Sequence, residues 1–379
     1  MTASLTRIAA IARKEFVHIA RDWRMIVTVL VMPLFQLLLF AYAISFDVRN
    51  VPAVVLDQDR TVASRAYVDA IGTSGFFHVR GNVADMTQID RAFNQNLARV
   101  AVVVAPGYGN AIAGGGKGRV AVLVDGSEPN SAQLGQAYAV ALNNTLSRQT
   151  LVSWANARGQ TLTGVGMLEP RVRDWYNPER RSADFLVPGL MVVIIMIVTV
   201  QQTAVTLVRE RESGTLEQML QSPLRQPELI LGKVLPWAIL GFVDTVAITA
   251  VSIAVFQVPL RGDVVVLGVG MFLFILCSLS IGLVLSAVAP SIESANLLAL
   301  LISLLPGFML SGLAFPLASI PVALQVVSYL FPGRYMVEIA RGVFLRGTSW
   351  GVLGIQVVWL GVYAAIGLGL ATVLNRRRA

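Results

Sequence analysis

The glycine-rich run Gly114–Lys117 is the pattern that most resembles a chemical site, because glycine-rich loops ending in lysine bind nucleotide phosphates. Such a loop also needs a glycine five positions before its last Gly–Lys pair and a hydroxyl side chain after the lysine. Those two positions hold Ala111 and Gly118. We therefore expect this chain to bind no nucleotide and to have no catalytic site.

The remaining reactive side chains are isolated in the sequence. Cys277 is the one cysteine, so it can form neither an internal disulfide nor part of a cysteine metal cluster. His78 has no set of possible ligands near it, and we expect it to be an ordinary surface residue. The sequence predicts no metal site and no cofactor bound by this chain.

The composition indicates an integral membrane protein. Of 379 residues, 55% are apolar and only 14% are charged, and the mean hydropathy is +0.67. A soluble globular protein has roughly 25% charged residues. The net charge of +8 is not gathered into Lys/Arg runs with interleaved aromatic residues, so we do not expect nucleic acid as a partner.

Six stretches are apolar enough to cross a bilayer as helices, which takes about 20 residues each. We place them at residues 25–46, 185–208, 234–256, 264–288, 296–315 and 350–374. The first is too long for the apolar part of a cleavable signal peptide. Residues 316–349 contain Pro316, Pro321 and Pro332, so we expect broken, re-entrant structure there.

Basic residues near the spans predict that both termini lie in the cytoplasm. Residues 1–24, the loop 209–233 and the tail 375–379 hold twelve Lys and Arg residues, against four in the opposite flanks. Short cytoplasmic segments carry this excess in membrane proteins. Within residues 1–24, apolar side chains recur at helical spacing, which predicts an amphipathic helix on the membrane surface.

Residues 47–184 read as an α/β domain inserted between spans one and two. Valine-rich strands are expected at 53–56, 100–104 and 119–124, and helices at 63–71, 86–97 and 131–155. The expected fold class is therefore an α-helical polytopic membrane protein with six transmembrane helices and an inserted extracytoplasmic α/β domain.

Three polar side chains inside the spans are candidates for a transport pathway. Asp244 lies near the middle of span three, and Gln201 and Gln202 lie in span two. An ionisable group inside a membrane is costly and usually faces a cavity or a partner. A pathway or coupling role for Asp244 and a structural carboxyl hydrogen-bonded to a neighbouring helix both remain open.

The loop after span two predicts a short helix. Thr215 and Gln218 form a capping box, and Pro223 would end the helix. Leu216 and Leu220 would then share one apolar face between charged flanks. This pattern is typical of a docking element, and a solvated surface helix is the alternative.

The sequence resembles the permease subunits of ABC transporters of the ABC-2 type, a class of exporters with six spans. One similar segment runs from Arg13 through Asp22 into span one, where Pro33 lies. A second runs from Arg209 to Pro223 and continues through Glu228 to Lys233. A third comprises 331–335 with Glu338, Arg341 and 344–347.

The resemblance implies partners and a coupling mechanism. Two permease chains would pair, and separate ABC ATPase subunits, carrying the ATP and Mg²⁺, would dock on the cytoplasmic face of a bacterial inner membrane. Membrane lipids and periplasmic adaptor proteins are further expected partners. The helix at 1–24 would be the elbow helix, and the ATPase-coupling residues would be Glu210, Arg211, Glu212, Gly214, Thr215, Leu216, Glu217, Gln218 and Leu220. The turn 290–293 is a second candidate contact.

Arg334, Glu338 and Arg341 would share one face of a helix before span six, where their charges could neutralise one another. We interpret this segment as a re-entrant gate at the exit of the pathway, with a plain surface ion network as the alternative.

The expected function is export of a hydrophobic or amphipathic compound, such as a drug, lipid-like molecule or secondary metabolite. A proton-coupled secondary transporter is one alternative, but such transporters usually need several ionisable groups inside the membrane and the spans offer only Asp244. A membrane-anchored sensor or assembly factor acting through residues 47–184 is another, although it would need only one or two spans.

Overall fold

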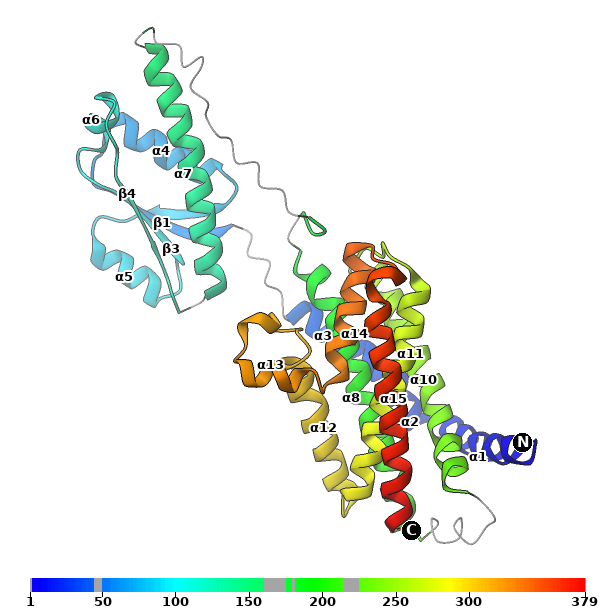
Figure 1. Cartoon of the computed structure of the whole chain (residues 1–379). Coiled ribbons are helices and arrows are strands. Elements are labelled where there is room, and N and C mark those ends of the chain that lie inside the picture. The colour runs from blue at the N-terminus through cyan, green and yellow to red at the C-terminus, as the bar shows by residue number, and fades with distance from the viewer. Residues whose placement is uncertain are drawn as a thin grey trace. The chain divides into compact units, whose positions relative to one another are not determined.

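The computed structural model describes residues 2–43, 50–127, 129–157, 159, 175–178, 181–214 and 225–378. The chain divides into two compact units, residues 46–172 and the remainder. We name them the inserted unit and the helical unit, and describe each by itself (Figure 1).

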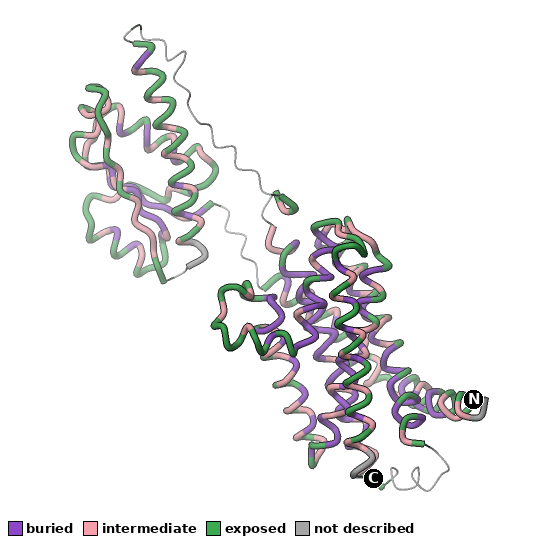
Figure 2. The backbone as a smooth tube through the Cα atoms, in the orientation of Figure 1, coloured by how far each residue is buried: buried purple, intermediate pink, exposed green. Residues whose placement is uncertain are grey.

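The helical unit contains six helices that are long and apolar enough to cross a membrane. They are Trp23–Ala43 (comprising α2 Trp23–Ile26, the π-helical turn η1 Val27–Val31 and α3 Met32–Ala43), Ser182–Glu212 (α8), Gln226–Ala254 (α10), Val264–Val288 (α11), Ile292–Met309 (α12) and Trp350–Asn375, within α15 (Trp350–Arg378). In α8, 89% of the most apolar stretch is buried, against 22% in α12 and α15. Helix α8 is therefore the centre of the unit, with α12 and α15 on its outside (Figure 2). The six predicted spans are confirmed.

Small residues allow α8 and α11 to approach closely. A Cβ added to Gly282 of α11 would lie 2.6 Å from the carbonyl oxygen of Val200 on α8. No side chain fits at that distance, so glycine permits the two backbones to pack directly. This contact lies in the interior of the bundle.

Helix α1 (Thr2–Arg21) precedes the first span and packs against α10. Its buried residues are Ile11, Ala12, Glu15 and Ile19, a spacing that forms one helical face. Asp22 separates α1 from α2, because its Oδ1 accepts the N–H groups of Arg24 and Met25 and caps the new helix.

Between α12 and α15 the chain forms short elements in place of one long helix. They are the 3-10 turn η2 (Leu317–Ser319), α13 (Val322–Ser328), α14 (Pro332–Arg341) and the π-helical turn η3 (Gly342–Arg346). Helix α14 is largely buried against α8, α11 and α15.

Spans three and five differ most from the expected bounds. Span five was placed at 296–315, but α12 begins at Ile292, where Ser291 and Ser294 form a capping box, and ends at Met309. Span three was placed at 234–256, but α10 begins eight residues earlier because Glu228 caps its first turn. Both helices begin earlier than expected because the search for uncharged residues excluded their first turns, which contain Glu228 and Lys233 in α10 and Glu293 in α12.

The inserted unit is built on a four-stranded sheet with the order β2-β1-β3-β4. The strands are β1 (Val51–Asp57), β2 (Phe77–Asn82), β3 (Val100–Val104) and β4 (Val120–Val124), and only the β3–β4 pair is antiparallel. Along β1 the side chains alternate between two cores: Val51, Ala53 and Val55 on one face, Val54 and Leu56 on the other.

Helices cover both faces of this sheet. Helices α4 (Val62–Thr73) and α7 (Pro129–Ala157) pack on the first core, and α5 (Met86–Asn94) packs on the second. A short helix, α6 (Tyr108–Ala113), follows β3. Strand β2 was not expected from the sequence, because its second half is polar and exposed, as is usual at a sheet edge.

Candidate functional site

Three helices meet where α8 ends and α10 begins. The ammonium of Lys233 on α10 lies 3.5 Å from Oε1 of Glu15 on α1, and it forms a second ion pair with Oε2 of Glu210 on α8. The Lys233 residue is only 2% exposed. Because a buried charge is costly unless it is paired, these contacts favour keeping α1, α8 and α10 together.

Lys14 completes the charge balance of this site. Its ammonium lies 3.6 Å from Oε1 of Glu210, and its side chain is half exposed. Two lysines therefore face two carboxylates. We name these four residues, Lys233, Glu15, Glu210 and Lys14, the Lys233 cluster.

The approach of α1 to α10 depends on Gly232, which precedes Lys233. A Cβ at this position would lie 2.7 Å from Cβ of Ile11 and 3.2 Å from the carbonyl oxygen of Ile8. Glycine thus brings the α1 backbone close enough for Glu15 to contact Lys233.

Glu228 forms a second link between α1 and α10, near the start of α10. Its Oε1 accepts a hydrogen bond of 2.7 Å from the Ser4 hydroxyl, and its Oε2 lies 3.5 Å from Nη1 of Arg7. The same Oε2 accepts the backbone N–H of Arg225 at 3.1 Å. One buried carboxylate therefore both caps α10 and holds the first turns of α1.

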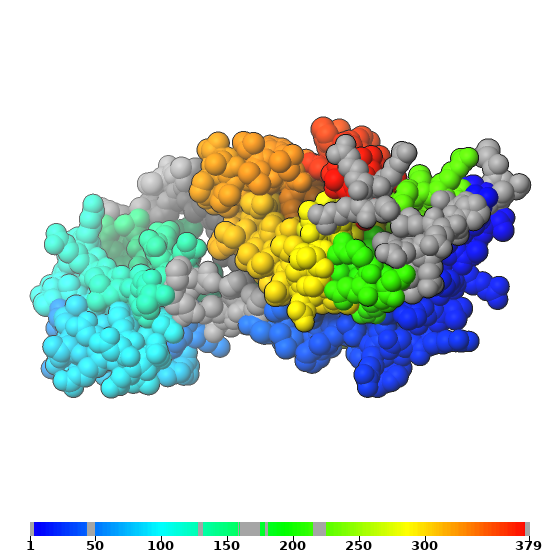
Figure 3. Space-filling view, turned by 90° about the horizontal axis from the view of Figure 1, so that it is seen from below, coloured from blue at the N-terminus to red at the C-terminus, as the bar shows by residue number. Residues whose placement is uncertain are grey.

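The end of α8 is joined to the turn between α11 and α12. Arg211 donates to the carbonyl oxygen of Ala289, and the Glu212 carboxylate accepts the N–H of Ile292 at 3.0 Å. We name these contacts the α8–α12 joint. The end of α8 lies between this turn and α1 (Figure 3). The sequence predicted 210–220 and 290–293 as separate candidate contacts, and the structure joins the described part of the first to the second.

Helix α8 ends at Glu212, and Gly214 adopts a left-handed conformation with φ +69°. Glycine adopts this conformation without steric cost, which is common just beyond a helix end. The predicted coupling residues Thr215, Leu216, Glu217, Gln218 and Leu220 lie outside the described residues.

Within the described residues, Asp244 forms no hydrogen bond with either of the other two pathway candidates, Gln201 and Gln202. Gln201 donates to Asn296 of α12 at 3.2 Å, and Gln202 lies half-buried on α8. Asp244 is 1% exposed, and both of its carboxylate oxygens lack a hydrogen-bond partner among the described residues. The expected structural alternative, a carboxyl bonded to a neighbouring helix, is thus not observed within this part of the chain.

The predicted neutralisation among Arg334, Glu338 and Arg341 is wrong for the described chain. Glu338 is exposed and forms no ion pair with either arginine. Arg341 instead donates to the carbonyl oxygens of Gly312 and Leu313, at 2.8 and 3.1 Å.

Arg334 also bonds to neighbours other than Glu338. Its Nη1 donates to the Ser328 hydroxyl at 2.6 Å, and its guanidinium lies 3.7 Å from the ring centroid of Tyr329. Gly312 and Leu313 lie in non-helical chain after α12, so their carbonyl oxygens are available to accept from Arg341, whereas Arg334 is attracted to the face of the Tyr329 ring. The two side chains stabilise the segment that leads from α12 to α14.

Comparison with known proteins decides the family. The model of the ABC-2 family transporter proteins matches residues 23–373, nearly the whole chain. The chain belongs to the ABC-2 transporter family. It is thus a multi-pass membrane subunit of an ABC transporter, as the three sequence segments indicated.

Curated relatives of this ABC-2 protein include three from Escherichia coli K12. "Probable multidrug ABC transporter permease YbhS" is 29% identical over 99% of this chain and 98% of its own length. "Probable multidrug ABC transporter permease YbhR" is 25% identical over 93% and 92%. "Inner membrane transport permease YhhJ" is 26% identical over 81% and 79%.

Sequence reasoning missed the Lys233 cluster in this ABC-2 subunit. Glu15 and Lys233 were placed from the sequence only within the segments that resemble ABC-2 permeases. Lys14 and Lys233 were counted among the basic residues that predict the orientation in the membrane. The available signal was position, because Glu15 lies between Ile11 and Ile19 on the apolar, buried face of α1. An acid on an apolar helix face needs a buried base, and Lys233 is one of only three lysines in the chain.

Proposed function

We propose that this chain is the permease subunit of an ABC exporter that moves a hydrophobic or amphipathic compound outward, using ATP hydrolysed by a separate ATPase. The family placement supports this proposal over a proton-coupled transporter. The word "multidrug" in the names of YbhS and YbhR favours a drug or lipid-like substrate. The chain itself binds no ATP; the partner holds ATP and Mg²⁺.

The end of the helical unit that contains the Lys233 cluster faces the cytoplasm in this proposal, with both termini on that side of a bacterial inner membrane. The distribution of basic residues supports the orientation. The loop 215–224 and the α8–α12 joint then form the surface that the ATPase contacts.

The α8–α12 joint is the observation that carries the proposal. A displacement of the 209–214 segment reaches α8 directly, α12 through Glu212, and α1 and α10 through Glu210. Packed helices transmit such movements as rigid bodies. Because α8 is also the central helix, one contact at its end moves most of the helical unit.

The chain pairs with a second permease chain, identical or related, through exposed apolar helix faces. Helices α12 and α15 expose large apolar side chains, among them Leu297, Leu305, Ile355 and Ile366. Such faces require either lipid or protein. Asp244 serves in the pathway or in coupling, and α14 with Arg334 and Arg341 forms the gate. Periplasmic adaptors are further partners of the exporter.

The test is reconstitution with the co-expressed ATPase in vesicles, followed by ATP-dependent transport of a lipophilic dye. We expect transport to require an ATPase with an intact catalytic site. Efflux that survives an inactive ATPase but is lost in Asp244→Asn would contradict the proposal and favour proton coupling.

Docking is tested separately by co-purification. Leu216→Asp and Glu217→Lys should release the ATPase without affecting membrane insertion. The matched control is Val62→Asp, an equally drastic change at an exposed position of the inserted unit. Retention of the ATPase by both variants would refute the docking assignment.

A further inference from the structure

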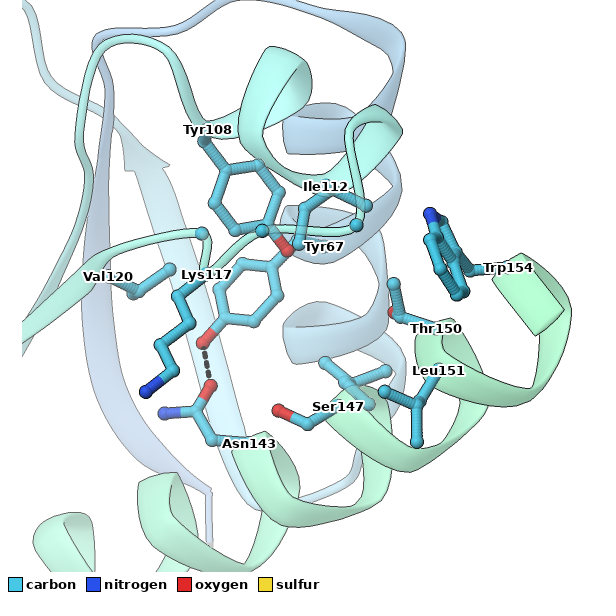
Figure 4. A pocket seen from close by; sticks show the side chains of 14 residues that line it. Tyr67, Tyr108, Ile112, Lys117, Val120, Asn143, Ser147, Thr150, Leu151 and Trp154 are labelled. Atoms are coloured by element: carbon cyan, nitrogen blue, oxygen red, sulfur yellow. Dashed lines mark hydrogen bonds between the residues drawn. The ribbon is translucent and has the colours of Figure 1, made fainter. Parts of the chain in front are cut away.

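A cavity of about 450 Å³ lies within the inserted unit. It is bounded by Tyr67 of α4, by α6, by the glycine-rich run that leads to β4, and by one side of α7 (Figure 4). Cavities of this size hold drug-sized ligands.

The glycine-rich run makes room for the aromatic walls of this cavity. A Cβ on Gly115 would lie 2.4 Å from Cζ2 of Trp154, and a Cβ on Gly118 would lie 2.6 Å from Cε2 of Tyr108. The glycine-rich run at Gly114–Lys117, which does not match a phosphate-binding loop, therefore has a packing role. Its missing side chains let two aromatic rings line the cavity.

The described lining of the cavity carries positive charge and no negative charge. Among the described residues that line the cavity, Lys117 is the one that carries a charge at neutral pH. It is exposed and has no ion pair within the described chain. Its ammonium points to the amide of Asn143 (Figure 4).

Tyr67 orients that amide. Its hydroxyl donates to Oδ1 of Asn143, which leaves the Asn143 Nδ2 as a donor beside Lys117. Burial raises the pKa of Tyr67 to about 12, so the phenol remains a donor at neutral pH. Two donors, one of them charged, therefore lie together at one end of an otherwise aromatic and apolar cavity.

We propose that this cavity binds a small amphipathic anion, with an aromatic or hydrocarbon body and one acidic group. The body packs against Trp154, Tyr108 and Leu151, and the acid accepts hydrogen bonds from Lys117 and Asn143. A cationic ligand is disfavoured because the described residues that line the cavity include no carboxylate. The site lies in the inserted unit and does not depend on the proposed transport reaction.

Protection of Lys117 from acetylation tests the proposal in the full-length protein in lipid nanodiscs. The probe is naphthalenesulfonate, and naphthylmethylammonium and inorganic sulfate are the comparison ligands. Mass spectrometry reports Lys117 acetylation relative to Lys14, whose side chain is 55% exposed and lies in the other unit. We expect naphthalenesulfonate alone to slow Lys117 acetylation saturably, by about fivefold at a concentration about four times its Kd, because the bound acid covers the ammonium.

A matched pair on α7 keeps the test specific. Leu151 and Val152 are both exposed, but only Leu151 lines the cavity. Leu151→Asp should abolish protection by repelling the anion, whereas Val152→Asp should leave it unchanged. In equilibrium dialysis, Lys117→Gln should weaken naphthalenesulfonate binding about fivefold, with Arg80→Gln on the exposed edge strand as its control.

Three results would overturn the proposal. They are the absence of saturable protection by naphthalenesulfonate, equal protection by the ammonium probe or by sulfate, and equal effects of the two aspartate variants.

Discussion

The ammonium of Lys233 lies 3.5 Å from the Glu15 carboxylate, although the two residues are 218 positions apart in the chain. This ion pair ties the surface helix α1 to the beginning of α10, and Glu210 extends it to the end of α8. Three helices that border the proposed ATPase contact are therefore linked through one buried side chain.

Replacing Lys233 should release α1. Lys233→Met leaves Glu15 and Glu210 without their shared cation, and breaking a buried ion pair costs on the order of 3 kcal/mol. Hydrogen exchange of α1 amides, measured by mass spectrometry, should accelerate by about 100-fold. Lys14→Gln is the control, because this half-exposed lysine contributes about 1 kcal/mol or less. Unchanged exchange in Lys233→Met would refute the role of the cluster.

Gly232 should not tolerate even a methyl group. Gly232→Ala places a Cβ 2.7 Å from that of Ile11, which has little freedom to move, so α1 must shift and thermal stability should fall. The matched variant is Gly268→Ala in α11, where the nearest atom lies 3.9 Å away. There the gain in helix propensity, about 1 kcal/mol, should raise stability. Equal melting temperatures for the two variants would contradict the close approach of α1 and α10.

Removing the Glu212 carboxylate should loosen the α8–α12 joint. Glu212→Ala leaves the Ile292 N–H without its acceptor, so this amide should exchange faster and coupling of ATP hydrolysis to transport should decrease severalfold. Glu293→Ala, which removes a neighbouring exposed carboxylate with no ion pair in the described chain, should leave exchange of the Ile292 amide unchanged. Normal coupling in Glu212→Ala would argue against transmission through this joint.

The inserted unit should lose stability in acid because of Asp59. This carboxylate accepts the Thr61 hydroxyl and the N–H groups of Gly109 and Gly107 at 2.6 to 2.8 Å. These hydrogen bonds, chiefly that from Thr61, lower the pKa of Asp59 below its usual 3.8. The stabilisation is therefore complete above about pH 4 and is lost as the pH falls through the lowered pKa.

The corresponding variant is Asp59→Ala. Its destabilisation relative to the natural sequence should be large at pH 7 and should shrink in strong acid, where the carboxyl of the natural protein is protonated too. Loss of the infrared β-sheet band on heating measures this effect, because the sheet of the described chain lies in the inserted unit. A pH-independent difference would contradict the contribution of the charged form.

Much of this architecture was predictable because hydropathy and charge act locally. The six spans and strand β3 follow from apolar runs, and β3 lies at the predicted residues. The partners of Arg341 were not predictable, since the carbonyl oxygens of Gly312 and Leu313 become available only where the chain after α12 leaves helical geometry. Helical spacing pointed to Glu338, four residues after Arg334, but tertiary contacts prevailed over that local choice.

The lengths of α8 and α10 have a consequence for where the charges lie. At 1.5 Å per residue, 31 and 29 residues extend about 46 and 44 Å, whereas a hydrocarbon layer is about 30 Å thick. The two helices are thus longer than this layer by roughly 16 and 14 Å, which is more than two helical turns each. An overhang at the end where α8 ends and α10 begins would contain both Glu210 and Lys233, beside the α1 residues that contact them.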